Sequence, residues 1–427
     1  MPTIVTTTAG QYGTALGNSR KLFRDAYGKY ISVSKNANVV LCYCNNDSPT
    51  SGWVTNNLGP SFAVDPGEAF GVAGAYDSTN DKLMVGWVGS LNLKLAQITF
   101  SRDANHNITD YTAGSVLSIA PAYVNTHNPS LWMLHNGEVA TVWGDEKTSG
   151  AKHSVVKFCR VVFGSPPTYK NAAGTASSVN TISSDYTSTF KIRHPTIVER
   201  INSGTGQYDL YAFWSLLTLN FYKNKATWAS PNWSWGSEAV AFTASYPMMH
   251  CFGAYDTLNS LIIYGVMLDY AVGTIEVRSI NASDTDSSIS VSGLASAYRH
   301  CASLAINQAN GDYYIFYYRE APYNVYYVKR SGGSWGSETQ FTTTANEYYP
   351  VCKVDGAGNR IELIWTHYTG SAYNVYYDYL SLVAPPTGFK KLQYFSEPPT
   401  VGQFNKLRFA SEPPVVGAFN KLLYEGE

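Results

Sequence analysis

Four histidines recur at one kind of place in this chain, at or just before the start of a short apolar run. The residues are His127 in Thr-His-Asn-Pro, His194 in Arg-His-Pro, His250 in Met-His-Cys and His300 in Arg-His-Cys. Imidazole titrates near neutral pH and binds metals, so such a set could act as acid and base or as metal ligands. The alternative is a hydrogen-bonding cap that was duplicated with its strand. The sequence favours the cap, because no carboxylate recurs beside the histidines to orient them.

Arginines accompany two of these histidines. Arg193 and Arg299 directly precede His194 and His300, and Arg319 follows the next apolar run. A guanidinium group can hold a carboxylate or hydrogen-bond a sugar. The predicted ligand-binding set is therefore Arg193, His194, His250, Arg299, His300 and Arg319, with no metal and no cofactor.

Carboxylates are the other residues with catalytic potential, since a glycosidase needs two that face one another across its substrate. Those near predicted strand ends are Asp25, Asp77, Asp145, Glu199, Asp256, Asp269, Glu320 and Glu362. The sequence does not select a converging pair, so no catalytic residue is predicted. Asp77 and Asp256 each follow Ala-Tyr and precede a turn, where an Asp side chain bonds backbone amides.

Short aromatic and β-branched runs must position these residues. Between Tyr298 and Pro350, four such runs (300–306, 313–318, 323–328 and 338–344) are separated by Asn, Gly and Ser turns, which predicts a four-stranded antiparallel sheet. The unit repeats about every fifty residues: Tyr-Asn-Val-Tyr-Tyr occurs at 323–327 and 373–377. First strands are expected near Lys21, Val72, Pro129, Pro195, Cys251, Cys301 and Val351.

This spacing predicts an all-β fold, a seven-bladed β-propeller, with six or eight blades as alternatives. Second strands carry a large aromatic residue for packing between blades: Trp87, Trp143, Trp214, Tyr264, Tyr317 and Trp365, and less clearly Tyr30. The seventh unit meets Ala384-Pro385-Pro386 before a fourth strand. Residues 3–9 resemble the fourth strand at 339–345, so an N-terminal strand is expected to complete the last blade and close the ring.

The predicted hairpins between third and fourth strands carry a further pattern. Two segments resemble degenerate Asp-boxes that lack the aspartate: Ser331-Gly332-Gly333-Ser334-Trp335 and Pro231-Asn232-Trp233-Ser234-Trp235. Over residues 3 to about 380, the chain resembles the sialidase-like, BNR-repeat propellers at the level of fold. Sialidases also use three arginines, a Tyr/Glu pair and an Asp. Arg24 sits where the first arginine would be expected but lacks the proline context, so the resemblance does not extend to activity.

Composition limits the function classes. Charged residues make up 14% of the 427 residues and the net charge is −1, so no basic field exists to attract nucleic acid. No apolar run is long enough to span a bilayer, and no signal peptide is apparent. The six cysteines form no CxxC pair and are expected to be small buried side chains. The 33 tyrosines invite a sugar-binding interpretation, although many must fill space between blades.

A different repeat follows the propeller, which is assigned to residues 1–383. Residues 384–427 repeat a Pro-Pro, Gly, Phe and Lys-Leu pattern three times, with Lys-Leu recurring every fifteen residues. A unit this short cannot bury its own apolar side chains, so the tail is expected to dock on other protein subunits. The predicted partner-binding residues are Phe389, Leu392, Phe404, Leu407, Phe419 and Leu422.

Two function classes follow from these patterns. The favoured one is a non-enzymatic structural or adhesion protein of a virus or phage particle, or of a surface assembly, that binds a glycan or protein partner through the propeller. Its location would be extracellular or on a virion surface, after synthesis in the cytoplasm. The alternative is a sialidase-like glycoside hydrolase or another carbohydrate-active enzyme.

Overall fold

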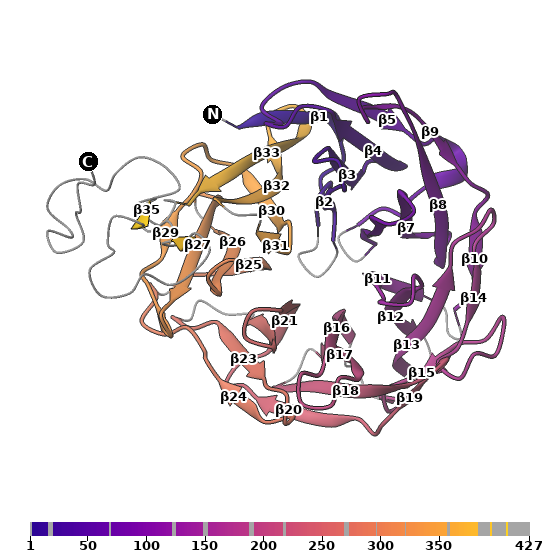
Figure 1. Ribbon diagram of the computed structural model, residues 1–427, viewed down its shortest axis with the longest axis vertical. Coiled ribbons are helices and arrows are strands. Elements are labelled where there is room, and N and C mark those ends of the chain that lie inside the picture. Colours follow the sequence, from indigo (N-terminus) through magenta and orange to yellow (C-terminus); the bar gives the residue numbers. More distant parts are fainter. Residues whose placement is uncertain are drawn as a thin grey trace, which may run out of the picture. The chain divides into compact units, whose positions relative to one another are not determined.

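The chain divides into two compact units, Met1–Leu380 and Ser381–Glu427, which are considered separately. The computed structural model describes residues 2–15, 20–67, 70–121, 125–147, 153–187, 192–216, 219–268, 273–295, 297–320, 322–356, 359–382, 393–394 and 407–408. In the described part of the first unit, seven sheets follow one another around a ring, and their strands are antiparallel except for the parallel pair β25 and β31 (Figure 1). The prediction of a seven-bladed β-propeller is therefore confirmed.

The first four blades contain consecutive strands. Blade 1 has β2 (Leu22–Arg24), β3 (Tyr30–Lys35), β4 (Val39–Cys44) and β5 (Trp53–Asn57), and a 3-10 turn, η1 (Pro60–Phe62), follows it. Blade 2 has β6 (Val72–Asp77), β7 (Lys82–Gly89), β8 (Asn92–Arg102), β9 (Ile108–Ala113) and β10 (Leu117–Ile119). Blade 3 has β11 (Asn125–Met133), β12 (Val139–Lys147), β13 (His153–Val162), β14 (Thr168–Lys170) and β15 (Asn180–Thr181). Blade 4 has β16 (Ile192–Ile201), β17 (Tyr208–Leu216), β18 (Asn220–Ala229), β19 (Asn232–Trp235) and β20 (Ala239–Thr243).

The remaining blades lead to the closure of the ring. Blade 5 has β21 (Met248–Asp256), β22 (Leu261–Leu268), β23 (Glu276–Ile280) and β24 (Asp286–Ser288). Blade 6 has β25 (Arg299–Asn307), β26 (Asp312–Arg319), β27 (Asn324–Ser331), β28 (Ser334–Trp335) and β29 (Thr339–Gln340), and β31 (Asp355–Gly356) pairs with β25. Blade 7 has β30 (Glu347–Cys352), β32 (Arg360–Tyr368) and β33 (Tyr373–Ser381), and its fourth strand is β1 (Thr3–Ala9).

The N-terminal strand closes the ring as the sequence predicted. Strand β1 pairs antiparallel with β33, with Thr3 opposite Tyr377 and Ala9 opposite Tyr373. It also reaches blade 1, where the Thr55 hydroxyl donates to the carbonyl of Val5 at 3.0 Å. Figure 1 shows β1 at the junction between the last and first blades. Strand β1 thereby covers the outer edge of β33 and joins the last blade to the first.

Packing between blades follows the predicted aromatic positions. The large aromatic residues of the second strands are all buried, and each is at most 2% exposed: Tyr30, Trp87, Trp143, Trp214, Tyr264, Tyr317 and Trp365. Near the axis the blades crowd, and small residues are needed there. A Cβ atom added to Gly74 would lie 2.8 Å from the ring of Phe23 in the neighbouring blade, so any side chain at this position would force the ring to move. All six cysteines are free and buried, which confirms that expectation.

A β-bulge recurs in the innermost strands of blades 3 to 7, where the ladder register shifts by one residue. In four of these strands, the first extra residue has a positive φ without being glycine: Asn128 at 44°, His194 at 41°, Cys301 at 53° and Tyr349 at 54°. An extra residue bends the strand and redirects the side chains around it. The direction of a side chain at the start of one of these strands therefore depends on whether its residue lies before the bulge or within it.

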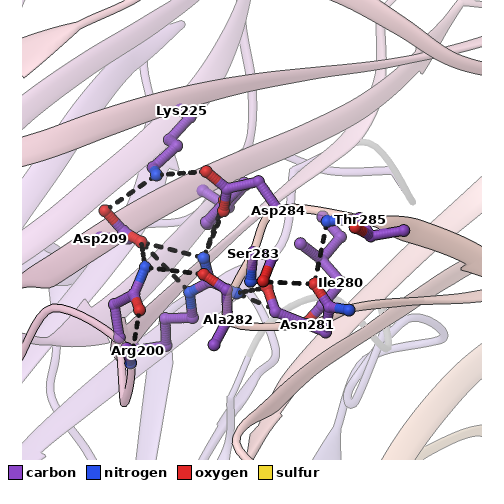
Figure 2. Close-up of polar contacts among 12 residues, drawn as sticks. Arg200, Asp209, Lys225, Ile280, Asn281, Ala282, Ser283, Asp284 and Thr285 are labelled. Atoms are coloured by element: carbon purple, nitrogen blue, oxygen red, sulfur yellow. Dashed lines mark hydrogen bonds and ion pairs between the residues drawn. The ribbon is translucent and has the colours of Figure 1, made fainter.

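The blades are also joined by polar contacts, and one such network links blades 4 and 5 (Figure 2). Arg200 at the end of β16 is fully buried and donates to Asp209 at 3.0 Å and to the carbonyl oxygen of Asn281 at 2.5 Å. The same guanidinium is paired with Asp284, in the turn between β23 and β24. Lys225 bridges the two carboxylates, at 3.1 Å from Asp209 and 2.7 Å from Asp284.

In the second unit, the structure describes two short strands. Strand β34 (Gln393–Tyr394) pairs antiparallel with β35 (Leu407–Arg408). The predicted partner-binding residues Phe389, Leu392, Phe404, Phe419 and Leu422 lie outside the described residues, and only the backbone of Leu407 lies inside them. In the described part of the chain, no helix is long and apolar enough to cross a membrane.

Candidate functional site

The ring has two ends, and they carry different chemistry. At one end the innermost strands begin, close to the loops that join second and third strands; this end is called the histidine face. At the other end the innermost strands finish in hairpins such as 77–82 and 256–261; this end is called the hairpin face. The residues predicted from the sequence gather at the histidine face, whereas the cavity described below opens at the hairpin face.

The four histidines do not occupy equivalent positions, although each stands near the start of an innermost strand. His127 and His300 precede the bulge, His194 is its first residue and His250 is its second. A shift of one residue along a strand turns a side chain to the opposite face. The histidines therefore form separate groups instead of one circle.

His127 and His300 are equivalent, and each meets a carboxylate at the end of the second strand of its own blade: Glu146 lies in β12, and Glu320 directly follows β26. His127 Nε2 lies 3.1 Å from Glu146, and His300 Nε2 lies 3.0 Å from Glu320. The expectation that no carboxylate accompanies these histidines is therefore wrong. The partners were missed because they lie about twenty residues away along the chain and become neighbours only when the two strands pair.

His194 and His250 are buried and stack on one another, with ring centroids 4.6 Å apart and planes inclined by 14°. The Sγ atom of Cys301, in the next blade, lies 3.7 Å from Nε2 of His250. These side chains fill space between innermost strands of blades 4, 5 and 6. Among the described residues, no group of three or more His, Cys, Asp or Glu side chains could hold a metal ion.

Two of the predicted arginines are engaged in blade 6. Arg299 Nε donates to Glu338 Oε1 at 2.9 Å and Arg319 Nη1 donates to Glu338 Oε2 at 2.8 Å. The Tyr317 hydroxyl donates to the same carboxylate at 2.7 Å. Burial opposes the charge on Glu338, but Tyr317 and the two arginines hold its pKa below the usual range. Arg193 lies in β16, and its side chain is outside the described part.

Several carboxylates considered for catalysis have structural partners. Asp77 and Asp256 accept backbone N–H groups of their turns, which confirms the capping role. Asp25 accepts from the backbone of Lys29 at 2.7 Å and is paired with Arg102 at 2.6 Å. Glu362 accepts from the hydroxyl of Tyr30 at 2.5 Å.

The other carboxylates considered for catalysis are Glu199, Glu320, Asp145 and Asp269. Glu199 contacts the ring of His135 at 2.6 Å, and burial raises the pKa of Glu199 to about 8. Glu320 is the partner of His300. Asp145 is 1% exposed. Asp269 lies outside the described residues.

Tyrosines gather on the histidine face around blades 6 and 7, and we call this set the tyrosine surface. Ring contacts run from His300 to Tyr318 at 5.1 Å, from Tyr318 to Tyr348 at 5.6 Å and from Tyr348 to Tyr323 at 5.3 Å. Burial and the neighbouring Tyr323 and Tyr373 raise the pKa of Tyr348. The members are Tyr12, Tyr298, Tyr318, Tyr323, Tyr348, Tyr349, Tyr368 and Tyr373.

Exposure differs across the tyrosine surface. Tyr298 is 42% exposed and Tyr323 is half-buried, whereas Tyr318 and Tyr349 are buried. Beneath them, Glu347 is 1% exposed and contacts His367 Nδ1 at 3.1 Å. Burial raises the pKa of Glu347 to about 8 and lowers the pKa of His367. Exposed ring faces therefore stand over a buried layer that has little tendency to carry charge near neutral pH.

The hairpin face contains a cavity of about 310 Å³, which we call the axial pocket. Its lining comes from four blades: Arg20, Leu22, Phe23 and Arg24 from blade 1, Ala75, Tyr76 and Ser78 from blade 2, Trp132 and Met133 from blade 3, and Lys353 and Val354 from blade 7. The guanidinium of Arg20 lies 3.6 Å from the ring centroid of Trp132 and donates to the carbonyl of Leu131 at 2.7 Å. The lining therefore combines cationic groups with apolar walls.

Sequence reasoning missed this pocket. Arg20, Lys21 and Arg24 stand within five residues, and this basic cluster was the available signal. Lys21 itself is fully buried, and burial together with the nearby Lys35 lowers its pKa well below the usual range. No signal marked Trp132 or Lys353, because they enter the pocket from other blades.

No known protein-family model matches the chain. No curated protein matches it either.

Solved structures are similar in fold. They include AofleA from Arthrobotrys oligospora, at 11% identity and a TM-score of 0.47, covering 78% of this chain and 89% of that one. A six-bladed fungal lectin, the Aleuria aurantia lectin, matches at 11% identity and 0.42, covering 74% and 96%. The NanB sialidase from Streptococcus pneumoniae matches at 10% identity and 0.40, covering 82% and 79%. The resemblance is one of propeller fold alone and says nothing about the ligand of this chain.

Proposed function

We propose that this protein is a non-enzymatic adhesion propeller that binds a glycan on the tyrosine surface. The main support is the continuous set of ring contacts from Tyr298 through His300 and Tyr318 to Tyr323, at the edge of which Tyr298 is 42% exposed. An aromatic face stacks on the apolar face of a sugar ring, and the phenol hydroxyl adds a hydrogen bond. Tyrosine offers both at a low cost in side-chain entropy, since only two torsions must be fixed.

Binding fits this surface better than hydrolysis does. A hydrolase of the alternative class needs two carboxylates that both reach the sugar. Here Glu320 is 42% exposed at its side chain and is paired with His300, whereas Glu347 is 1% exposed beneath the tyrosines. A sugar stacked on the rings would touch the first carboxylate and not the second.

A glycan array tests the proposal, with the purified full-length protein as the probe. We expect binding to at least one class of hexose-terminated glycan, and we expect the double variant Tyr298→Ala/Tyr323→Ala to lower the affinity about tenfold or more, since two stacking faces are lost. Tyr27→Ala is the matched control, because Tyr27 is 44% exposed on the hairpin face. Equal binding by the double variant and the wild type, or no binding by the wild type to any glycan, would refute the proposal.

We further propose that the tail docks the propeller onto other subunits of a virion or surface assembly, outside the cell. Support comes from its composition: aromatic and Leu residues repeat in register, unlike a disordered linker, which is rich in charge and poor in apolar residues.

We expect light scattering to give an oligomeric mass for the full-length protein. The variant Phe389→Ser/Phe404→Ser/Phe419→Ser should give the monomer mass, because each repeat loses its largest apolar side chain. Lys406→Gln, in the second of the three repeats, is the control and should leave the oligomeric mass unchanged. A monomeric wild type would contradict docking between copies of this chain.

A further inference from the structure

We infer that the glycan bound on the tyrosine surface carries a free amino group, so that the ligand is a cationic hexosamine and not a neutral or an acidic sugar. This inference rests on the proposed glycan binding and names the chemical class of its ligand. It is carried by the position of Glu320, whose side chain is 42% exposed and whose Oε1 lies 3.0 Å from Nε2 of His300. One accessible carboxylate therefore stands at the edge of a set of aromatic faces.

Glu320 belongs to the side of blade 6 that carries the rings. Side chains alternate between the two faces of a sheet, and residues paired across two strands share a face. His300 is paired with Tyr318, and Glu320 stands two residues beyond Tyr318, so all three project from the same face. The backbone N–H of Glu320 also donates to the carbonyl of Tyr298 at 3.1 Å, which holds the carboxylate next to an exposed ring.

The arginines of blade 6 project from the opposite face. Arg299 is paired with Arg319 across β25 and β26, one position before the pair formed by His300 and Tyr318. Both guanidinium groups donate to Glu338, and the side chain of Arg299 is 2% exposed. The positive charge of this blade is therefore turned away from the tyrosine surface, while the negative charge of Glu320 is turned toward it.

The ionisable groups that the other elements bring to these rings are buried. Glu347 and His367 of blade 7 form a pair, and burial raises the pKa of Glu347 to about 8 and lowers the pKa of His367. Lys35 Nζ lies 5.6 Å from the ring centroid of Tyr12, but this lysine is 4% exposed and donates to the carbonyl of Phe70 at 2.8 Å. Of these groups and Glu320, it is Glu320 that presents an exposed charge to a ligand.

An ammonium group satisfies both features of this surface. The face of an aromatic ring carries partial negative charge and attracts a cation, and an exposed carboxylate does the same. His300 occupies Oε1 of Glu320, and no described residue forms a hydrogen bond with Oε2, so this oxygen can accept from a sugar amine. The carboxylate of an acidic sugar would meet Glu320 as a like charge, which selects against that class.

Calorimetry and ligand-observed NMR on the full-length protein test the inference with two oligomers of equal length and linkage, one of glucosamine and one of N-acetylglucosamine, at a pH where the free amine is protonated. We expect the glucosamine oligomer to bind about five- to tenfold more tightly, and we expect this preference to shrink as salt is added. A uronic acid oligomer should bind more weakly than both. Equal or tighter binding of the N-acetylated oligomer, or no binding of either, would overturn the inference.

Glu320→Gln tests the carboxylate directly, because it removes the charge and keeps a hydrogen-bonding group beside His300. It should lower the affinity for the glucosamine oligomer about five- to tenfold and leave the affinity for the N-acetylated oligomer unchanged. Asp47→Asn is the matched control, since it removes the same charge from a side chain that is 86% exposed in the loop between β4 and β5 of blade 1. Circular dichroism melting checks that both variants are folded. An undiminished preference for the amine in Glu320→Gln would refute the role of Glu320.

The proposed function and this inference fail in different ways. Tyr298→Ala/Tyr323→Ala should weaken the binding of both oligomers by a similar factor, because stacking does not depend on the amine, whereas Glu320→Gln should weaken one of them. A protein that binds the N-acetylated oligomer as well as the free amine, and loses both in the double variant, would keep the glycan site and lose the inference. Equal losses of both oligomers in Glu320→Gln would give Glu320 a structural role and would also overturn the inference.

Discussion

Replacement of Arg200 by methionine is expected to lower the free energy of unfolding by about 3–5 kcal/mol, because it leaves buried negative charge without its main partner. Arg200 is 0% exposed at its side chain and Asp209 is 3% exposed. The variant would lose the bonds of this guanidinium to Asp209, to Asp284 and to the carbonyl of Asn281 (Figure 2). These contacts join blade 4 to the hairpin of blade 5, so the loss weakens the junction between two blades.

Urea denaturation followed by tryptophan fluorescence measures this effect. The matched control is Arg278→Met: Arg278 is 24% exposed at its side chain and lies 3.7 Å from Asp286, so its loss should cost no more than about 1 kcal/mol. Arg200→Lys should recover only part of the stability, because an ammonium cannot reproduce the planar set of donors. A shift for Arg200→Met as small as that for Arg278→Met would show that the network contributes little to stability.

A charge placed on the inner side of the N-terminal strand is expected to have a comparably large effect. Val5 is 2% exposed and packs in the cluster that contains Leu22, Tyr30 and Tyr377. Val5→Asp would bury an unpaired carboxylate and remove apolar contact, at a cost of about 3 kcal/mol or more. The strand that completes blade 7 should then detach, and the free edge of β33 should promote association between molecules.

The neighbouring residue supplies the control. Ile4 is 44% exposed, so Ile4→Asp should change the free energy of unfolding by no more than about 0.5 kcal/mol. Melting temperature and light scattering on both variants distinguish the two outcomes. If Ile4→Asp and Val5→Asp destabilise the protein equally, the strand does not close the ring through its buried face.

The fold could be predicted because it repeats. Seven copies of a four-stranded pattern each supply turn residues, apolar alternation and one large aromatic, so an error in one copy does not change the count. Even the least regular unit follows the rule: Tyr30 is buried and bonded to Glu362 of blade 7. The closing strand was predictable for the same reason, since residues 3–9 resemble a fourth strand that stands elsewhere in the chain.

The arrangement of the polar residues on the histidine face was less predictable, because a difference of one residue along a strand decides which side chains meet. Relative to the bulge, His194 stands one residue and His250 two residues beyond the position of His127 and His300, and this difference separates histidines that look alike in the sequence. Glu338 lies in the turn that follows Trp335, about twenty and forty residues from Arg319 and Arg299, so no local pattern joins it to these two arginines. Pairing between strands brought these charges together.

The sequence by itself determined the blade count, the closing strand and the burial of the aromatic and cysteine side chains. These properties depend on hydrophobic period and turn chemistry, which are local and are repeated along the chain. Only the tertiary structure decided which polar groups meet. The axial pocket draws Arg24, Trp132 and Lys353 from blades 1, 3 and 7. Residues so distant in sequence become neighbours only when the ring closes. The distance between blades is set by this closure and not by any local sequence pattern.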